Sequence, residues 1–118
     1  MIRALAIVAA LAASQGNAQD ATEASGAVLR SLDKVNGNLA DYQMSSGEVV
    51  KLGRLEIKLN SCRYPTGNPA GDAFASLEIR GEGSVSPLFE GWMIASSPAL
   101  NALDHPRYDV WVLRCITS

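Results

Sequence analysis

The sequence predicts a small all-β domain, and three observations carry that prediction. Apolar and polar residues alternate along Leu55–Asn60, which is the pattern of a strand with one buried face. Gly and Pro residues divide much of the chain into short segments that suit strands better than long helices. The two cysteines, Cys62 and Cys115, supply the sulfur atoms for one disulfide bond. We therefore expect an antiparallel barrel or sandwich of about seven strands with one disulfide.

The first 18 residues have the layout of a cleavable export signal. Ala4–Ala13 is an apolar run that follows a basic residue, and Gly16–Ala18 offers the small residues that a signal peptidase recognises. This run is shorter than the roughly 20 apolar residues of a membrane-spanning helix, and no later run in the chain reaches that length. We therefore expect no stable membrane insertion of the mature chain. The expected organisation is a signal peptide over 1–18, a disordered mature N-terminus over 19–27 and a single β domain over 28–118, located in the periplasm.

Composition and charge exclude several classes of protein. The chain has 118 residues, of which 47% are hydrophobic and 19% are charged, as expected for one folded domain. Its formal net charge is −2, so there is no basic excess to bind nucleic acid. One histidine, His105, and a single cysteine pair do not make a metal site, and we expect neither a metal nor a cofactor.

The cysteine pair is expected to be structural. An even number of cysteines in a short exported chain indicates a disulfide, and Cys62 and Cys115 lie too far apart in the sequence for a redox-active motif. Closing so long a loop stabilises a fold by roughly 4 kcal/mol on the chain-entropy argument. One difficulty is that Cys62 has the parity of the polar face of its strand. A bend at Ser61 or a strand end near Asn60 would remove that conflict.

Turn signals and periodicity place the elements along the chain. Asn36-Gly37 predicts a hairpin with a two-residue turn, and Tyr64–Asp72 predicts a long exposed loop because it contains two Pro and two Gly. Ser97 at an N-cap, followed by Pro98, predicts a short helix before the last strand. The expected strands are 39–44, 48–52, 55–60, 73–79, 87–95 and 108–116.

The last two strands are apolar on both faces, which predicts that they lie in the middle of a sheet. On that interpretation Trp92 and Trp111 belong to the core, together with Phe89 and Tyr108. The alternative is that these aromatic residues lie exposed on a β surface, where they would stack on sugar rings or on the side chains of a peptide.

A hydrolase is one alternative hypothesis for this sequence. Asp104-His105, with Ser96 and Ser97 nearby, offers the residue types of a nucleophilic triad. However, neither serine lies in a Gly-x-Ser-x-Gly motif, and neighbouring Asp and His residues rarely reach the required geometry. We expect His105 instead to stabilise the end of the short helix.

Recognition is expected on the loops, because loops on a rigid β scaffold commonly carry it. The two stretches concerned are the loop 63–72 and the turn 98–107. The candidate contact residues are Arg63, Tyr64, Asn68, Ser96, Ser97, Asn101, His105 and Arg107.

The run Phe89–Pro106, followed by Cys115, resembles the signature of a family of exported alphaproteobacterial proteins, the domain of unknown function 2155. Leu32–Lys34 and Cys62 match the earlier motifs of this family. The resemblance implies a location in the cell envelope and a shared pair of cysteines. It brings no catalytic residue.

The resulting functional hypothesis is a noncatalytic periplasmic module for protein binding or assembly, with another envelope protein as its partner. One alternative is an exported enzyme inhibitor that inserts Tyr64–Gly71, which Pro65 and Pro69 stiffen. The other is a cell-wall hydrolase that uses His105. The sequence does not indicate any small ligand.

Overall fold

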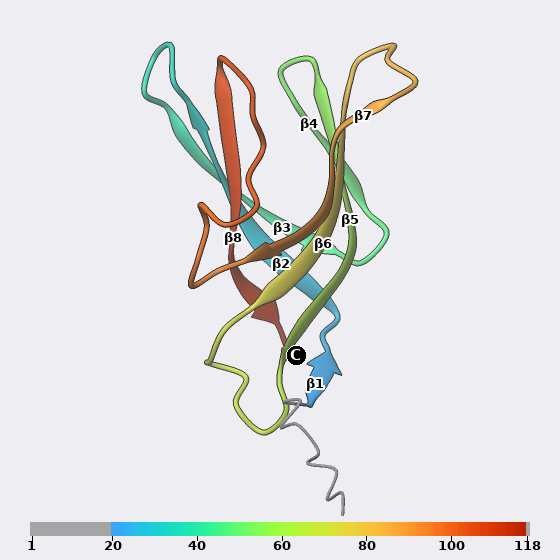
Figure 1. Ribbon diagram of the computed structural model, residues 1–118, viewed down its shortest axis with the longest axis vertical. Coiled ribbons are helices and arrows are strands. Elements are labelled where there is room, and N and C mark those ends of the chain that lie inside the picture. The colour runs from blue at the N-terminus through green and yellow to red at the C-terminus, as the bar shows by residue number, and fades with distance from the viewer. Residues whose placement is uncertain (1–19, 118) are drawn as a thin grey trace, which may run out of the picture.

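Eight strands form two sheets that pack against each other as a sandwich. The computed structural model describes residues 20–117, and Figure 1 shows the two sheets spreading apart towards one end of the molecule. In this part of the chain there is no helix and the sheets do not close into a barrel. The strands are β1 (Ala21–Glu23), β2 (Gly26–Asp33), β3 (Leu39–Ser45), β4 (Val49–Leu52), β5 (Leu55–Pro65), β6 (Phe74–Gly81), β7 (Pro87–Ile94) and β8 (Tyr108–Ile116).

The larger sheet has the order β1-β5-β6-β7, with β4 also paired to β5, and the smaller sheet has the order β3-β2-β8. Every strand pair is antiparallel. The all-β antiparallel prediction is therefore confirmed, with a sandwich as the architecture. The predicted signal peptide, 1–18, lies outside the described residues.

The core lies between the two sheets and is built from alternate residues. Leu55, Ile57 and Leu59 of β5 are almost fully buried, as their alternation with polar residues predicts. Leu29 of β2 and Val112 of β8 face them from the smaller sheet and are equally buried. Burying a side chain of this kind stabilises the fold by about 1.5–3 kcal/mol, so the paired inner faces provide the main stabilisation.

The disulfide between Cys62 and Cys115 joins β5 of the larger sheet to β8 of the smaller one, with the Cα atoms 5.7 Å apart. A register shift follows Leu59 and leaves Asn60 unpaired, which turns Cys62 to the buried face. A matching shift in β8 leaves Leu113 unpaired and turns Cys115 inwards. A bulge therefore resolves the parity conflict at Cys62. The inward orientation of each cysteine requires a bulge in its own strand.

The hairpin predicted at Asn36-Gly37 is present, but its turn is longer than two residues. Gly37 has a φ of 77°, in the left-handed region that suits glycine, whereas Asn36 does not. The Gly37 N–H donates to the Asp33 carbonyl oxygen at 2.7 Å, and the Asp33 N–H donates to the Asn38 carbonyl oxygen at 2.9 Å. A two-residue turn of the predicted type requires positive φ at both positions, so this connection forms a wider loop.

The N-terminal stretch expected to be disordered is ordered in its described part, residues 20–27. β1 pairs with the end of β5, where Glu23 lies opposite Arg63, and β2 already begins at Gly26. The prediction missed β1 because three residues are too few to show periodicity. The pairing also extends β5 to Pro65, so Arg63 and Tyr64 lie in a strand and the loop begins after it.

The short helix expected from Pro98 to Leu103 does not form, and this stretch consists of turns. Leu103 is buried, but Leu100 is 72% exposed, so there is no continuous apolar stripe to hold a helix against the core. A helix this short is not stable without such packing. The segment instead makes single-turn hydrogen bonds, from Ser97 N–H to the Ile94 carbonyl oxygen and from Leu100 N–H to the Ser97 carbonyl oxygen.

β7 and β8 are edge strands, and the prediction of central positions is wrong for both. Phe89 and Tyr108 are buried as expected, but Trp92 is 41% exposed and Trp111 is only partly buried. The second apolar face of β7 therefore has no layer of protein from residues 20–117 packed against it. It lies on the outer surface of the sandwich.

Candidate functional site

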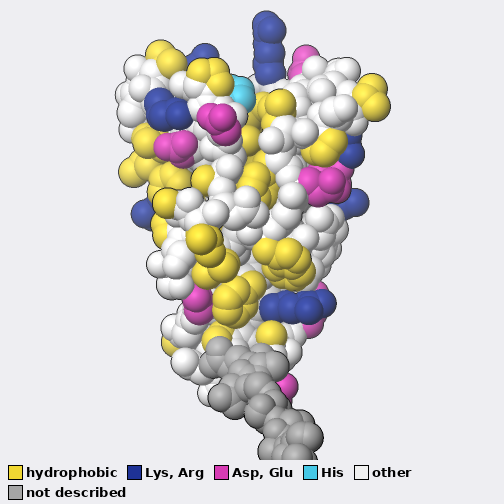
Figure 2. All heavy atoms as spheres, viewed as in Figure 1, with side chains coloured by type: hydrophobic (Ala, Val, Ile, Leu, Met, Phe, Trp, Pro, Cys, Tyr) yellow, Lys and Arg dark blue, Asp and Glu magenta, His cyan; other side chains and the backbone are white. Residues whose placement is uncertain are grey.

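The outer face of the larger sheet carries an apolar groove next to β1. Its walls are Trp92 and Ile94 of β7, Phe74 of β6, Arg63 of β5 and Ala21 of β1, and it encloses about 280 Å³. Figure 2 shows hydrophobic side chains gathered in the lower half of the molecule, with an extended basic side chain along their border. Neighbouring strands bring these residues together because Arg63 lies opposite Phe74, and Phe74 lies opposite Ile94. We call these five residues the Trp92 groove.

Arg63 forms the polar border of the Trp92 groove. Its guanidinium carbon lies 5.4 Å from the centre of the Trp92 ring, within the range of a cation–π contact. Its Nε donates to Glu23 Oε1 at 3.3 Å. Arg63 is therefore held from both sides, and it covers part of the Trp92 ring while leaving the rest exposed.

The backbone of β7 beneath the groove is fixed by Asn101. Asn101 Nδ2 donates to the Trp92 carbonyl oxygen at 2.9 Å, which satisfies a group on the free edge of the sheet. A Cβ atom on Gly91 would lie 3.1 Å from the same Nδ2, so glycine leaves room for this contact. This arrangement gives a physical reason for the pattern Gly91-Trp92 followed by Asn101.

Two loops that the sequence predicts as contact surfaces are joined beside the groove. Ser96 Oγ donates to Asp72 Oδ2 at 2.6 Å, and the Ser96 N–H donates to Asp72 Oδ1 at 2.9 Å. Partial burial raises the pKa of Asp72, but the hydrogen bonds from Ser96 and from the Ala73 N–H outweigh it and leave this pKa below its usual value. Asp72 is therefore a stable anion that ties the 66–73 loop to the 95–107 connection.

The remaining contact residues predicted in these loops differ in how far they are buried. Tyr64 is partly buried and packs against the core. Asn68 and Ser97 are exposed and take part in turns, through the Gly71 N–H to Asn68 carbonyl bond and through the Leu100 N–H to Ser97 carbonyl bond.

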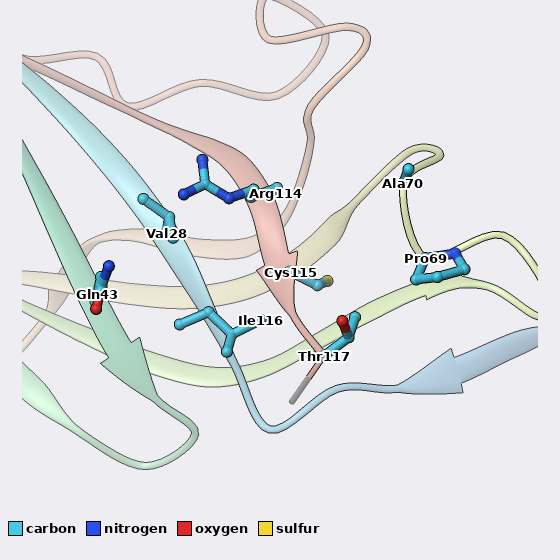
Figure 3. Close-up of a pocket in the computed structure, with 8 residues that line it drawn as sticks. All are labelled: Val28, Gln43, Pro69, Ala70, Arg114, Cys115, Ile116 and Thr117. Carbon is cyan, nitrogen blue, oxygen red and sulfur yellow. The ribbon is translucent and has the colours of Figure 1, made fainter.

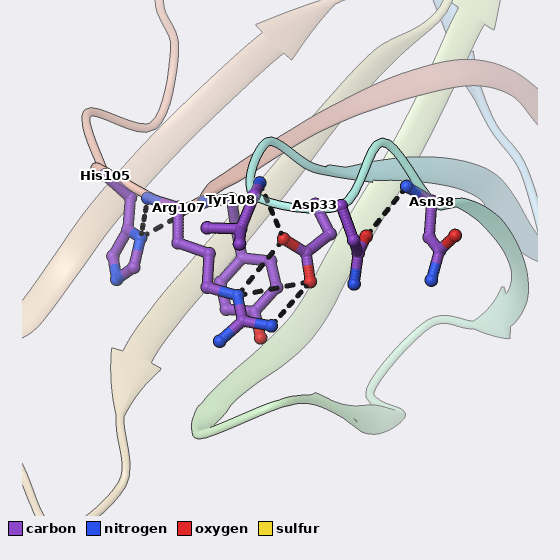
Figure 4. A network of polar contacts seen from close by, with 7 residues as sticks. Asp33, Asn38, His105, Arg107 and Tyr108 are labelled. Carbon is purple, nitrogen blue, oxygen red and sulfur yellow. Dashed lines mark hydrogen bonds and ion pairs between the residues drawn. The ribbon is translucent and has the colours of Figure 1, made fainter.

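His105 and Arg107 belong to a separate network, which fastens the end of the 95–107 connection to the β2–β3 hairpin (Figure 4). Arg107 Nε lies 3.1 Å from both Asp33 carboxylate oxygens, and Nη2 donates to Asp33 Oδ2 at 2.9 Å. Lys34 Nζ donates to the His105 carbonyl oxygen at 2.6 Å. Hydrogen bonds from Arg107 lower the pKa of Asp33. These side chains therefore hold the fold together, and the structure does not bring them to the Trp92 groove.

The imidazole of His105 is also used structurally. Its Nδ1 accepts hydrogen bonds from the Arg107 N–H at 3.0 Å and from the Tyr108 N–H at 3.2 Å. No helix end lies there for His105 to stabilise, so that expected role is wrong. Ser96 instead pairs with Asp72, and the hydrogen bonds of residues 20–117 join neither Ser96 nor Ser97 to His105.

A larger depression of about 590 Å³ lies near the disulfide at the end of β8. Figure 3 shows Arg114 and Gln43 on one side of it and Pro69 and Ala70 of the loop on the other. The depression is open to solvent, and both polar and apolar residues line it. Residues 20–117 contain no cluster of three or more potential metal ligands, and none of their segments forms a helix long and apolar enough to cross a membrane.

Sequence reasoning identified Arg63 and Asn101 but missed the centre of the site. Trp92 was expected in the core, because a strand that is apolar on both faces is usually central. Phe74 and Ile94 were not among the candidate contact residues. The signal that would have found the groove was the alternative interpretation, aromatic residues exposed on a β surface. In β7, an edge strand with two apolar faces, one face packs against the core and the other lies on the surface.

The fold and the site define a disulfide-bonded β-sandwich with an exposed, arginine-bordered apolar groove. Residues 27–115 match the family described as "Uncharacterized protein conserved in bacteria (DUF2155)", and the chain belongs to that family. This finding confirms the resemblance drawn from Phe89–Pro106.

One curated relative is the "Uncharacterized protein RP359" of Rickettsia prowazekii (strain Madrid E), which is 26% identical over 87 residues. The match covers 71% of this chain and 56% of the relative, so the chain spans little more than half of that protein. No solved structure matches this chain.

Proposed function

We propose that this protein is a noncatalytic module of the bacterial cell envelope that binds another polypeptide through the Trp92 groove. The observation that carries the proposal is the exposed indole of Trp92, 41% accessible in a groove lined by Phe74 and Ile94. Large aromatic side chains and arginine are the residues that most often dominate the binding energy of protein interfaces. An exposed apolar patch with a polar border is typical of a surface that binds another protein.

The rigidity of the groove supports binding with little loss of conformational entropy. Asn101 fixes the backbone of Trp92, and Arg63 holds its ring, so few rotatable bonds would have to be ordered on association. The joined loops, tied by Asp72 and Ser96, stand beside the groove and provide a polar rim. A polar rim around an apolar centre is the usual anatomy of a protein interface.

The periplasmic location is part of the proposal. A leader over 1–18 with the composition of an export signal supports it. So does the buried Cys62–Cys115 bond, because structural disulfides persist in oxidising compartments.

The two alternatives have less support. An inhibitory loop should stand clear of its scaffold, whereas the segment from Tyr64 onward begins inside β5, and Thr66 is bound both to the Asp20 carbonyl oxygen and to the Thr22 hydroxyl. A hydrolase needs an unprotonated imidazole nitrogen beside a nucleophile. His105 Nδ1 accepts two backbone N–H groups, which places the proton of the neutral ring on Nε2 and leaves neither nitrogen available as a base.

Affinity capture from detergent-solubilised envelopes tests the proposal. We expect the tagged wild-type protein to retain a recurrent polypeptide that the Trp92→Ala variant loses. Val85→Ala is the matched control, because Val85 is an apolar residue that is 88% exposed on a different loop. Capture that is equal for Trp92→Ala and the wild type would contradict the proposal.

A further inference from the structure

We propose that the polypeptide bound by the Trp92 groove is a second copy of this chain, with the outer faces of the two larger sheets packed against each other. This inference rests on the proposed function and names the partner for the same site. A two-fold symmetric pair, in which both copies use the same patch, is the most common arrangement of soluble oligomers.

The charges of this face carry the inference. In the strand register, Glu23 lies opposite Arg63, Lys51 opposite Glu56, Glu56 opposite Arg80, Lys58 opposite Glu78 and Glu78 opposite Glu90. The outer face thus holds four basic and four acidic side chains, and its charges cancel. The whole chain carries a formal charge of −2, so its excess negative charge lies elsewhere. This face can approach its own copy without the like-charge repulsion that net-charged surfaces suffer.

The shape of the face agrees with this partner. Two sheets stack face to face at about 10 Å when their twists match, and two copies of one sheet have the same twist. Trp92, Phe74 and Ile94 would then form the apolar centre, and the charged residues farther along β5 and β6 would form the rim.

Two other occupants are disfavoured by specific contacts. A sugar ring requires a free aromatic face and several hydrogen-bonding groups, but Arg63 already stacks on Trp92 and the other groove residues are apolar. A peptide that adds as a strand to the edge of β7 requires free backbone groups there. The Trp92 carbonyl is taken by Asn101, and the Ile94 carbonyl accepts from the Ser97 N–H.

Sedimentation equilibrium of the purified, disulfide-bonded chain tests the inference. We expect a reversible monomer–dimer equilibrium in the wild type, and a dimerisation constant weakened roughly 30-fold or more by Trp92→Ala, as for an interface hot spot. A chain that stays monomeric up to the highest soluble concentration would overturn the inference.

A charge-reversal pair gives the sharper result. Arg63→Glu makes the border of the groove acidic, and Glu23→Arg makes it basic, so each variant alone should be monomeric. An equimolar mixture of the two should form a heterodimer, because the altered faces then attract each other. The matched controls are Arg30→Glu and Asp41→Arg, which reverse an ion pair on the outer face of the other sheet and should leave dimerisation unchanged.

The two proposals fail in different ways. If the mixture does not associate while Trp92→Ala still abolishes capture of a different envelope protein, the second copy is wrong and the binding groove stands. If the charge-reversed mixture associates but capture from envelopes recovers only the chain itself, the second copy is the partner. If Trp92→Ala changes neither dimerisation nor capture, both proposals are overturned.

Discussion

The guanidinium of Arg63 stacks over the ring of Trp92 at 5.4 Å while its Nε is bound to Glu23. This one side chain connects three strands, β1, β5 and β7, across the outer face of the larger sheet. The cation therefore sets the exposure of the indole that we place at the centre of the binding groove.

Replacing Arg63 with alanine should loosen Trp92 without unfolding the protein. Both members of the Arg63–Glu23 pair are about half exposed, so its loss should change the free energy of unfolding by less than about 1 kcal/mol. In a Trp111→Phe background Trp92 is the only tryptophan, and we expect the quenching of its selectively excited fluorescence by acrylamide to increase when Arg63 is replaced. Arg30→Ala in the same background is the control. Equal quenching in the three proteins would show that Arg63 does not shield the ring.

Removing the disulfide should cost much of the stability of this small domain. Cys62 and Cys115 are both buried and join the two sheets, so a Cys62→Ala and Cys115→Ala double variant should lose about 2–5 kcal/mol in its free energy of unfolding. Urea denaturation of the oxidised protein and of the double variant measures this difference. A loss below about 1 kcal/mol would mean that the core alone holds the sheets together.

Two glycines with positive φ provide a matched pair of substitutions. A Cβ atom on Gly37 meets nothing within 4 Å, so Gly37→Ala should cost only the backbone strain, roughly 1 kcal/mol. A Cβ atom on Gly53 would lie 2.2 Å from the Tyr108 hydroxyl oxygen. Gly53→Ala should therefore lower the melting temperature more than Gly37→Ala. Equal effects would contradict the close contact between the β4–β5 turn and Tyr108.

The Asp72 contact predicts a dependence of stability on pH. Because hydrogen bonds lower the pKa of Asp72 in the folded state, the ionised group stabilises the fold at pH values above the usual value of about 3.9, and this contribution disappears as the pH falls through the lowered pKa. At pH 7 we expect Asp72→Asn to be less stable than the wild type by about 1 kcal/mol. Below the lowered pKa of Asp72 the two proteins should converge. Asp104→Asn, on an exposed carboxyl, is the control in urea titrations at each pH. A difference that persists unchanged into acid would refute the role of the Asp72 charge.

Much of the fold followed from the sequence because local patterns determined it. The strand from Tyr108 to Ile116 was predicted with its observed bounds, and the alternation of Leu55, Ile57 and Leu59 gave the buried face of β5. Asn36-Gly37 placed the hairpin. In each case the signal lies within a few residues and does not depend on the rest of the chain.

The features that sequence reasoning missed depend on tertiary structure. β1 forms only through its pairing with the end of β5, and the helix at Pro98 fails because only Leu103 reaches the core. The bulges at Asn60 and Leu113 each reverse the parity of the strand, so alternation alone could not place the cysteines. The predicted contact residues are divided between two places for the same reason. Arg107 is bound to Asp33 and the His105 carbonyl oxygen to Lys34, and both partners lie far away in the sequence.

Photo-crosslinking in intact cells tests the central claim most directly, since it asks whether the Trp92 groove is covered where the protein works. A photoreactive amino acid would be placed at Phe74 or Ile94 in the groove and, for comparison, at Val85 on the exposed β6–β7 turn. We predict a discrete product from both groove positions, with the mass of two copies of the mature chain, and none from Val85. Groove positions that yield no more product than Val85 would contradict the account.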